Sequence, residues 1–280
     1  MTTINELTQR QGLRPRALIV TVYGLYARQE GGWMSVATLI RLLGEVEVDE
    51  PAVRSSISRL KRRGILATER VDGVAGYALS ASARDILDEG DRRIFSRTRA
   101  GLEDGWLLAV FSVPESERTK RHTLRTRLTW LGFGTVAAGV WVAPAHLGSE
   151  TRHVLERDEL SSYVDLFHAD HLAFDHIEAR VRQWWDLAPL QQMYDEFLAT
   201  YAPVLTRWRR RRASADAEGF ADYVRALTAW RRLPFLDPGL PHDVLPDGWP
   251  GTRATELFFD LRDRLAEPAH RHVQAVRQPG

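Results

Sequence analysis

Apolar residues recur every three or four positions in three successive stretches near the N-terminus, and this spacing predicts three helices. Proline suits the first turn of a helix, so Pro15 and Pro51 mark the starts of the first and the third. Ser35 is a good N-cap for the second helix. Two short runs of strand type follow at Ile65–Thr68 and Gly76–Leu79. The pattern therefore predicts three helices followed by a β-hairpin.

The third predicted helix has one apolar face and one cationic face. Val53, Ile57 and Leu60 recur at intervals of four and three residues and form an apolar stripe. The residues that fall off this stripe and face outward are Arg54, Ser55, Ser58, Arg59 and Arg62. From position 51 to position 63 there are five cationic residues and no anionic one. Such a helix can bury one face in a core and present the other to phosphates and base edges, although a solvated helix with cations near its C-terminus has the same pattern.

The neighbours of this cationic helix favour DNA binding over simple solvation. Asp72-Gly73 is a strong signal for a tight hairpin turn. Three helices followed by a hairpin is the order of a winged helix-turn-helix, in which the cationic helix would be the recognition helix. The predicted hairpin tip, Val71–Gly76, contains no arginine or lysine. We therefore expect this wing to contribute shape and packing more than affinity.

The middle of the chain alternates between strand and helix patterns. The predicted elements are a strand at Trp106–Val113, a helix from Pro114 through Leu131, a strand at Thr135–Ala143, a helix over residues 150–160 and a strand within Tyr163–Leu172. Strand, helix, strand, helix, strand within about 70 residues suggests a small α+β domain of ferredoxin-like type.

The last third of the chain is predicted to be helical. Helical spacing begins at Ile177, is interrupted by a Pro- and Gly-rich loop at Pro234–Gly251, and ends with a helix over Arg253–Glu267. The predicted fold class is α+β with three domains. These are a winged helix-turn-helix with a linker helix over residues 1–98, a ferredoxin-like middle domain over 99–176, and a helical C-terminal domain over 177–280.

Composition restricts the class of protein. The chain has 280 residues, of which 44% are hydrophobic and 27% are charged, as is ordinary for a soluble globular protein. The net charge is only +1, so any nucleic-acid binding must depend on a local basic patch. The absence of cysteine excludes disulfides and thiolate metal sites. No apolar run approaches a membrane span and the N-terminus lacks a signal-peptide core, so we expect no membrane association and a cytoplasmic location.

Two patterns that suggest ligand chemistry have simpler structural interpretations. The run from Gly132 through Gly134 to Ala137 fits G-x-G-x-x-A, but a dinucleotide site needs a strand before the glycines and a helix after them. Here that order is reversed, and a turn is the better interpretation. A second group could ligate a metal but lacks a sharp motif, and consists of His168, His171, Asp175 and His176. No cofactor and no metal are therefore expected.

Catalytic motifs are also missing from the sequence. There is no G-x-S-x-G elbow and no P-loop, and the acidic residues Asp104, Glu115 and Glu117 are placed to cap helices. We therefore expect a protein that is not an enzyme. A catalytic site assembled from distant residues would leave no local motif. An enzyme on a repurposed regulator scaffold, acting on a pathway metabolite, thus stays as the alternative.

Three sets of segments together resemble the PaaX-like family of bacterial transcriptional regulators, named for the repressor of phenylacetate degradation. The first set is RALIVTVYGLY at 16–26 and AVRSSISRLKRRGIL at 52–66. The second is WLLAVFSVPE at 106–115 and RTRLTWLGFGTVAAGVWVAP at 125–144. The third is WWDLAPLQQMYDEFLATYAP at 184–203, WRRLPFLDPGLPHDVLPDGWPG at 230–251 and LFFDLRDRL at 257–265. The resemblance spans roughly residues 13–267, and the last loop is its most specific part.

This resemblance implies a dimeric repressor with an N-terminal winged helix, a middle domain similar to that of a CRISPR-associated nuclease family, and a helical C-terminal domain. Family members that respond to a metabolite typically bind an aryl-acetyl coenzyme A thioester, which releases them from the operator. The sequence departs from many relatives in its wing, which lacks their arginines. This departure puts contact between the wing and DNA in doubt, but not contact through the helix.

These considerations give two sets of candidate residues. The candidates for binding double-stranded operator DNA are Arg54, Ser55, Ser58 and Arg59 at base edges, and Lys61, Arg62 and Arg63 at phosphates. The candidates for binding a small-molecule effector, an acyl-CoA or an aromatic acid, are Trp141, His168, Trp184, Trp185 and Arg207. Arg207 begins a dense basic run that could neutralise phosphates of coenzyme A, or could be a solvated helix end. We expect a homodimer in which effector binding changes the spacing of the two DNA-binding heads.

Overall fold

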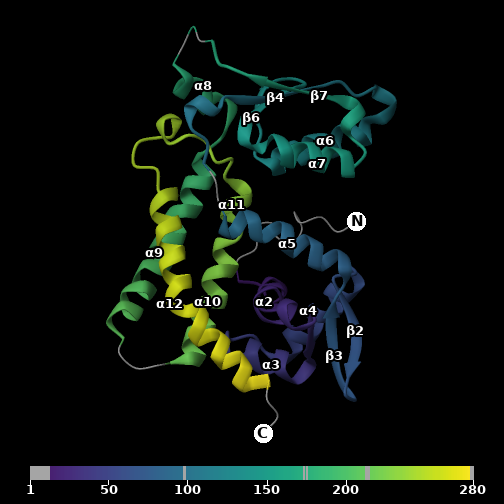
Figure 1. Cartoon of the computed structure of the whole chain (residues 1–280), viewed down its shortest axis with the longest axis vertical. Coiled ribbons are helices and arrows are strands. Elements are labelled where there is room, and N and C mark those ends of the chain that lie inside the picture. The colour runs from purple at the N-terminus through teal and green to yellow at the C-terminus, as the bar shows by residue number, and fades with distance from the viewer. Residues whose placement is uncertain (1–12, 97–98, 173, 175, 212–214, 278–280) are drawn as a thin grey trace. The chain divides into compact units, whose positions relative to one another are not determined.

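The three predicted N-terminal helices and the hairpin are present in the computed structural model (Figure 1). The helices are α2 (Pro15–Val22), α3 (Val36–Glu45) and α4 (Glu50–Arg62), and the hairpin strands are β2 (Leu66–Val71) and β3 (Val74–Leu79). The structure describes residues 13–96, 99–172, 174, 176–211 and 215–277. Most of the predicted polar lead-in, residues 97–98 at the predicted end of the linker helix, Asp175 and Arg212 lie outside the described residues.

Side-chain caps start two of these helices. The Ser35 hydroxyl accepts a hydrogen bond from the Thr38 backbone N–H at 3.0 Å, as predicted for an N-cap. The Asp49 carboxylate accepts one from the Ala52 N–H at 2.7 Å, with Glu50 in the first turn of α4. The start of α4 is thus fixed by a hydrogen bond between neighbouring residues.

A short strand that the apolar pattern did not predict completes the first sheet. Strand β1 (Trp33–Ser35) pairs with β3, which gives the order β1-β3-β2 with antiparallel neighbours. Gly76 allows this pairing, because a Cβ there would lie 2.4 Å from the Trp33 indole. At the other end of the hairpin, Asp72 and Gly73 have φ values of 50° and 79°, as a tight two-residue turn requires.

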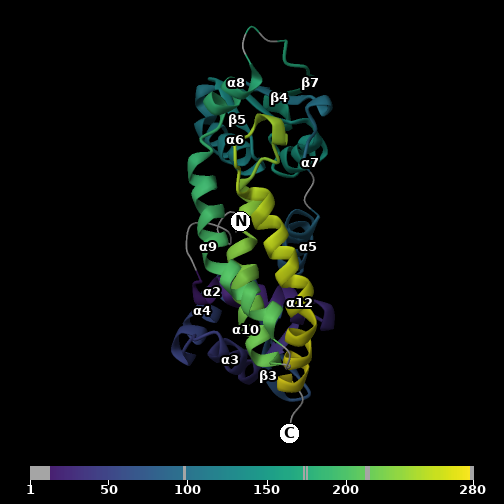
Figure 2. The ribbon, with the colours of Figure 1, turned by 90° about the vertical axis from the view of Figure 1, so that its left-hand side faces the viewer.

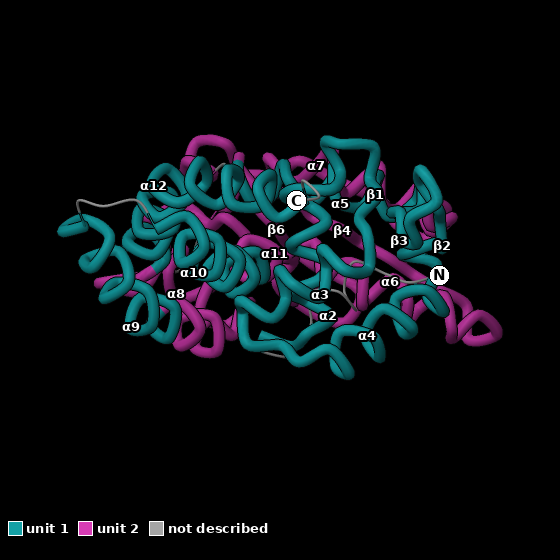
Figure 3. Tube along the Cα trace, turned by 90° about the horizontal axis from the view of Figure 1, so that it is seen from below, with its two compact units in different colours: residues 1–95, 195–232, 251–280 teal, residues 96–194, 233–250 magenta. Residues whose placement is uncertain are grey.

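Residues far apart in the sequence complete the unit that contains the hairpin. Packing divides the chain into unit 1 (residues 1–95, 195–232 and 251–280) and unit 2 (96–194 and 233–250), which Figure 3 colours separately. Unit 1 adds α5 (Ala81–Phe95), the C-terminal part of α9 (Ala188–Arg210), α10 (Asp216–Trp230) and α12 (Gly251–Arg277). Helices α10 and α12 run side by side in Figures 1 and 2. Between these helices the Trp230 indole stacks on Phe258, with ring centroids 4.8 Å apart. The predicted domain 177–280 is therefore shared between the two units, and the three predicted domain ranges stay a prediction.

The prediction that the last helix ends at Glu267 was wrong. Helix α12 continues for ten more residues, through Pro268 to Arg277, although proline removes one backbone donor. Beyond the proline, Ala269, Val273 and Val276 are buried, and this burial outweighs the lost hydrogen bond. The part of α12 after the proline also contacts the N-terminal helices of unit 1. There His272 Nε2 lies 2.6 Å from the Glu45 carboxylate at the end of α3.

Unit 2 is built on a four-stranded antiparallel sheet. Its elements in chain order are β4 (Trp106–Phe111), α6 (Arg118–Leu131), β5 (Gly134–Ala137), β6 (Val140–Pro144), α7 (Gly148–Arg157) and β7 (Val164–Ala169). The strand order across the sheet is β5-β6-β4-β7, so the two central strands are the first and third of the four. The chain then continues into α8 (Ile177–Trp184), and α11 (Leu233–Leu236) returns to the same unit.

The prediction of one strand over Thr135–Ala143 was wrong. This segment is a hairpin, in which β5 and β6 pair around a turn that contains Gly139 at φ 80°. The Gly139 carbonyl accepts a hydrogen bond from the Phe111 N–H at 2.9 Å, which ties the turn to β4. The apolar run reads as continuous because both strands of the hairpin have similar residues, and only the glycine marks the turn.

Short helical turns occupy many of the connections. They lie at Tyr23–Ala27, Arg28–Glu30, Leu102–Asp104, Glu115–Glu117, Ala145–Leu147, Ser161–Tyr163 and His242–Val244. The last of these lies in the Pro- and Gly-rich loop that the sequence marked as too long for a simple connector. None of the helices in the described part of the chain combines the length and apolar character needed to cross a bilayer.

The extended α12 leads to a stability prediction. Val273 is 1% exposed in the part of α12 beyond Pro268, whereas Val74 on the hairpin is 50% exposed. We expect Val273→Ala to lower the free energy of unfolding by about 1–3 kcal/mol, because it removes buried methyl groups and leaves a cavity. Val74→Ala, the same substitution at an exposed position, is expected to cost less than about 1 kcal/mol. Urea denaturation followed by circular dichroism measures both, and equal losses would show that the end of α12 is not packed.

Candidate nucleic-acid interface

Helix α4 separates its apolar and cationic residues as the sequence predicts. Val53, Ile57 and Leu60 are buried, each with at most 3% of its surface exposed. All the predicted DNA-contact residues are exposed, namely Arg54, Ser55, Ser58, Arg59, Lys61, Arg62 and Arg63. The outward face of α4 is therefore accessible in the computed structure, with five cations on it or at its C-terminal end.

Hydrogen bonds orient two of the arginines on this face. The Glu50 carboxylate binds Arg54 one turn further along, with Nε 2.7 Å and Nη2 2.6 Å from the same oxygen, Oε1. Both side chains are more than half exposed, so this pair contributes little to stability. Arg59 Nη2 donates to the hydroxyls of Ser55 and Ser56 at 3.2 and 3.1 Å. Arg54 and Arg59 are thus held close to the helix surface.

The structure places a further cation beside the tip of the β2–β3 hairpin. Arg70, on β2, donates from Nη1 to the Gly73 carbonyl at 2.9 Å and so folds back over the turn. The sequence interpretation considered only Val71–Gly76 and missed this residue by one position. The hairpin signal at Asp72-Gly73 would have identified it, because the two-residue turn places Arg70 opposite Ala75.

A shallow hollow lies between α3, the start of α4 and the tip of the β2–β3 hairpin. It has a volume of about 520 Å³, and its lining includes Arg41, Glu50, Arg54 and Val74. Arg41, on α3, is a second exposed cation at this surface that the sequence interpretation did not select. The outward face of α4, the hollow and the tip of the hairpin thus form one surface of unit 1, which we call the α4 surface.

The position of α4 depends on a helix from the far end of the sequence. Helix α2 packs against α4 and also against α10. Between α2 and α10, the hydroxyls of Thr21 and Thr228 are 2.8 Å apart in a buried hydrogen bond. Arg231 Nη2, just after α10, donates to the Ala17 carbonyl at 3.2 Å, and burial lowers the pKa of this guanidinium to about 10, with a smaller effect from Arg232. A buried guanidinium needs a hydrogen-bond acceptor, so the contact with the Ala17 carbonyl favours one alignment of α10 along α2.

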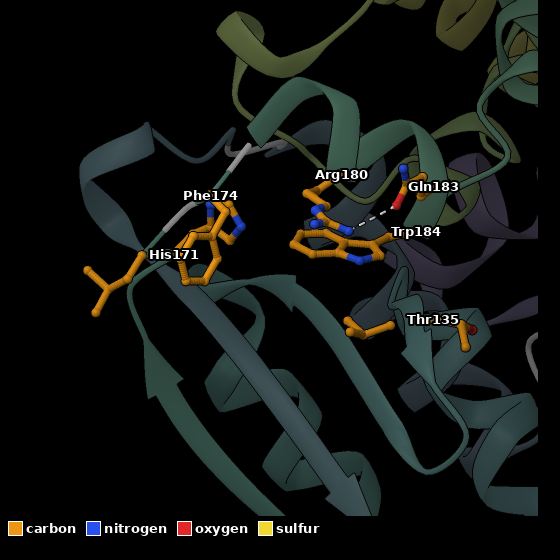
Figure 4. A pocket seen from close by; sticks show the side chains of 8 residues that line it. Thr135, His171, Phe174, Arg180, Gln183 and Trp184 are labelled. Atoms are coloured by element: carbon orange, nitrogen blue, oxygen red, sulfur yellow. Dashed lines mark hydrogen bonds between the residues drawn. The ribbon is translucent and has the colours of Figure 1, made fainter. Parts of the chain in front are cut away.

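The effector candidates fall into separate environments. Trp184 lines a hollow of about 320 Å³ in unit 2, between β5, the segment after β7, and α8. Figure 4 shows Arg180, Gln183 and Trp184 of α8 on one side of this hollow, with His171 and Phe174 at its rim and Thr135 opposite. The His171 and Trp184 rings meet edge to face at 5.8 Å. This hollow combines aromatic surfaces with a guanidinium and an amide.

The other effector candidates do not line that hollow. Trp185 is buried, and its indole N–H donates to the Gly132 carbonyl at 2.8 Å. Trp141 is buried against Phe111, and His168 Nε2 lies 3.0 Å from the Asp104 carbonyl. Arg207 belongs to unit 1, where it pairs with Asp222. The hollow contains Arg180, Gln183 and His171 as polar lining residues, which the sequence interpretation did not choose as effector contacts because they are separated from each other and form no motif.

The glycines of the G-x-G-x-x-A run have structural roles. Gly132 has φ 95° and ends α6, as a glycine cap does. A Cβ on Gly134 would lie 2.7 Å from the Trp185 ring and 2.8 Å from the Trp184 carbonyl. Both glycines are therefore needed for the turn and for close packing of α8 on β5. Of the four residues weighed as metal ligands, Asp175 lies outside the described part, and no group of three or more suitable side chains forms a metal site among the described residues.

Comparison with protein-family models gives three matches that follow one another along the chain. Residues 14–83 match "PaaX-like protein", residues 99–181 match "PaaX protein central Cas2-like domain", and residues 185–275 match "PaaX-like protein C-terminal domain". The matched segments contain α4, the four-stranded sheet and the C-terminal helices.

Two known proteins resemble the chain over most of its length. The transcriptional repressor PaaX of Escherichia coli (strain K12) is 25% identical over 260 residues, which cover 90% of this chain and 81% of that protein. The solved structure of the uncharacterized protein Rv0674 from Mycobacterium tuberculosis matches with a TM-score of 0.60 at 24% identity. That match covers 89% of this chain and 99% of the other, and it supports the fold alone.

The structural role of the glycine run can be tested with two matched substitutions. We expect Gly134→Ala to lower the free energy of unfolding by about 1–3 kcal/mol, because the added methyl group would overlap the Trp185 ring. Gly44→Ala, in α3, meets no atom within 4 Å and should raise it by about 0.4–1 kcal/mol. Chemical denaturation followed by tryptophan fluorescence measures both. A stable Gly134→Ala variant with an unchanged spectrum would contradict the packing described.

Proposed function

Because the chain belongs to the PaaX-like family, we propose that it is a transcriptional repressor that binds double-stranded operator DNA as a homodimer. The observation that carries this proposal is the exposed cationic face of α4, which is opposite its buried apolar stripe. A chain of net charge +1 that concentrates five cations on one helix and its end has a local patch suited to a phosphate backbone.

The proposal includes a winged helix-turn-helix in unit 1. The order α2, β1, α3, α4, β2, β3 supports it, with α4 as the recognition helix and the β2–β3 hairpin as the wing. It also includes a ferredoxin-like arrangement in unit 2, which is supported by the order β-α-β-β-α-β. In this proposal the middle domain is a scaffold and carries no catalytic site. The E. coli relative is a repressor, which supports a regulator rather than an enzyme.

DNA binding would use the two ends of α4 differently. The first three turns enter the major groove, where Arg54, Ser55, Ser58 and Arg59 reach base edges. At the C-terminal end, Lys61, Arg62 and Arg63 bind phosphates, and Arg70 adds a phosphate contact from the wing. Each phosphate that a cation neutralises makes binding more sensitive to salt. It adds about −0.9 to the slope of the logarithm of the binding constant against the logarithm of the salt concentration. In a homodimer the two copies of α4 would meet half-sites about 34 Å apart.

The proposed effector site is the hollow beside Trp184. Its volume of about 320 Å³ is at the small end for ligand pockets, so it suits an aromatic acid or the acyl group of an aryl-acyl-CoA thioester. Trp184 and Phe174 would stack on the aromatic ring, and Arg180 would bind a carboxylate or phosphate. Release from DNA needs only a modest difference in effector affinity between two states, on the order of 1–3 kcal/mol.

The DNA-binding role is tested by removing the two central arginines. We expect the double variant Arg54→Ala, Arg59→Ala to bind a duplex from upstream of its own gene about 30-fold or more weaker, because each arginine loses a contact worth at least about 1 kcal/mol. A gel-shift titration at fixed salt measures this. The control double variant Arg92→Ala, Arg152→Ala removes the same charge from exposed sites on α5 and α7 and should bind as the wild type does. Equal loss in both would mean that α4 does not read DNA.

The effector role is tested with two arginines on one helix. Arg180 lines the hollow, whereas Arg182 on the same helix lines a different depression. We expect aromatic acids or aryl-acetyl-CoA thioesters to release the wild type and Arg182→Ala from DNA, and to need at least about tenfold higher concentration for Arg180→Ala. The DNA affinity without ligand should be equal in all three. Identical release curves for the two variants would exclude this hollow as the effector site.

A further inference from the structure

Glu50 is an acidic residue at the N-terminal end of the cationic helix α4. It is the first residue of α4 and is half exposed, with 51% of its side chain accessible. It also lines the hollow between α3, α4 and the wing tip, together with Arg54. A carboxylate at this position faces the place where the negatively charged duplex would lie. The phosphates would repel this carboxylate, so charge alone does not explain a glutamate at this position.

The Glu50 carboxylate fixes the direction of the Arg54 guanidinium. A single oxygen, Oε1, accepts hydrogen bonds from Nε at 2.7 Å and is 2.6 Å from Nη2. A guanidinium has five N–H bonds in one plane, so this contact uses two and leaves three on Nη1 and Nη2. Two of those three, one on Nη1 and one on Nη2, are parallel, which is the arrangement that binds guanine O6 and N7. The second carboxylate oxygen of Glu50, Oε2, is by its chemistry a further acceptor.

We infer that Glu50 and Arg54 act as one specificity-determining pair that reads a guanine and a neighbouring cytosine. Arg54 donates to guanine O6 and N7, and Glu50 Oε2 accepts from the cytosine N4 amino group. Glu50 also weakens binding to duplexes that lack this cytosine. In such a duplex the carboxylate is desolvated and repelled by the phosphates, and no amino group compensates. This inference rests on the proposed function and adds to it the base pairs that α4 prefers.

The pair has a structural effect that must be separated from recognition. An acidic residue four positions before an arginine stabilises an exposed helix by about 0.2–0.5 kcal/mol, a fold-change near two that is independent of DNA sequence. A purely structural pair would therefore weaken binding to all duplexes by the same factor when it is broken. A reading pair would instead change the ratio between duplexes. The ratio is the measurement that distinguishes the two.

The test uses the full-length protein and two matched glutamates. A randomised duplex library first gives the sequence that the wild type prefers, and fluorescence anisotropy at fixed salt then measures binding to that duplex and to each single base-pair variant. We expect Glu50→Gln to lose about fivefold or more of the discrimination at a G·C position in each half-site, and to bind random duplex more tightly. Glu69→Gln removes the same charge from an exposed position on β2 and should keep all ratios. Arg54→Lys keeps the positive charge but loses the two parallel N–H donors, and should lose discrimination at the guanine, which lies at the same position or at the neighbouring one.

Each other result has a definite meaning. Unchanged ratios in Glu50→Gln, or a loss that falls neither at the position that Arg54→Lys affects nor next to it, would overturn the pair while leaving DNA binding by α4 intact. Equal changes in Glu50→Gln and Glu69→Gln would show that only charge matters and would also overturn it. If the wild type enriches no sequence from the library, the proposed function is overturned, and the proposal for Glu50 and Arg54 is overturned as well. Circular dichroism of each variant establishes that the helix content is unchanged.

Discussion

The packing of α2 between α4 and α10 is the contact on which the α4 surface depends. Helix α4 is short and isolated helices of its length are marginal in water, so its apolar stripe must be buried for the cationic face to exist. That stripe packs on α2, and α2 in turn is held by α10 through the Thr21–Thr228 hydrogen bond and the buried Arg231. Helix α12 adds contacts at the end of α3 through His272 and Glu45. The support of the α4 surface therefore depends on hydrogen bonds that span 207 and 214 positions of the sequence, and any change in the C-terminal helices acts directly on that support.

Charge pairing explains how a nearly neutral protein can have a basic surface in one place. The basic run that begins at Arg207 looks like a second phosphate site in the sequence, but three of its arginines bind acidic side chains of α10 and α12. The pairs are Arg207–Asp222, Arg209–Asp260 and Arg211–Glu218. On α4, by contrast, Glu50 is the only acidic residue, and its partner Arg54 keeps three N–H donors that their contact does not use. The two basic clusters thus have similar sequences and different roles, because one is neutralised within unit 1 and the other is directed to solvent.

The elements whose signals are local were predictable, and those that depend on distant partners were not. The caps at Ser35 and Asp49, the turn at Asp72-Gly73 and the apolar stripe of α4 each follow from a few adjacent residues. Strand β1 is three residues long and forms only because β3 lies beside it. The β5–β6 hairpin was hidden in one apolar run, and the end of α12 was placed too early because Pro268 is a stop signal unless the following residues are buried.

By itself, the amino-acid sequence determined the helix order at the N-terminus, the α+β class and the residues that form the cationic face of α4. It could do so because helical periodicity, capping and net charge are properties of neighbouring positions. Only the tertiary structure decided which cations are free to meet a partner, which tryptophans line the hollow in unit 2, and which helices support α4. Those outcomes depend on side chains brought together from distant parts of the chain, and neither periodicity nor composition records that proximity.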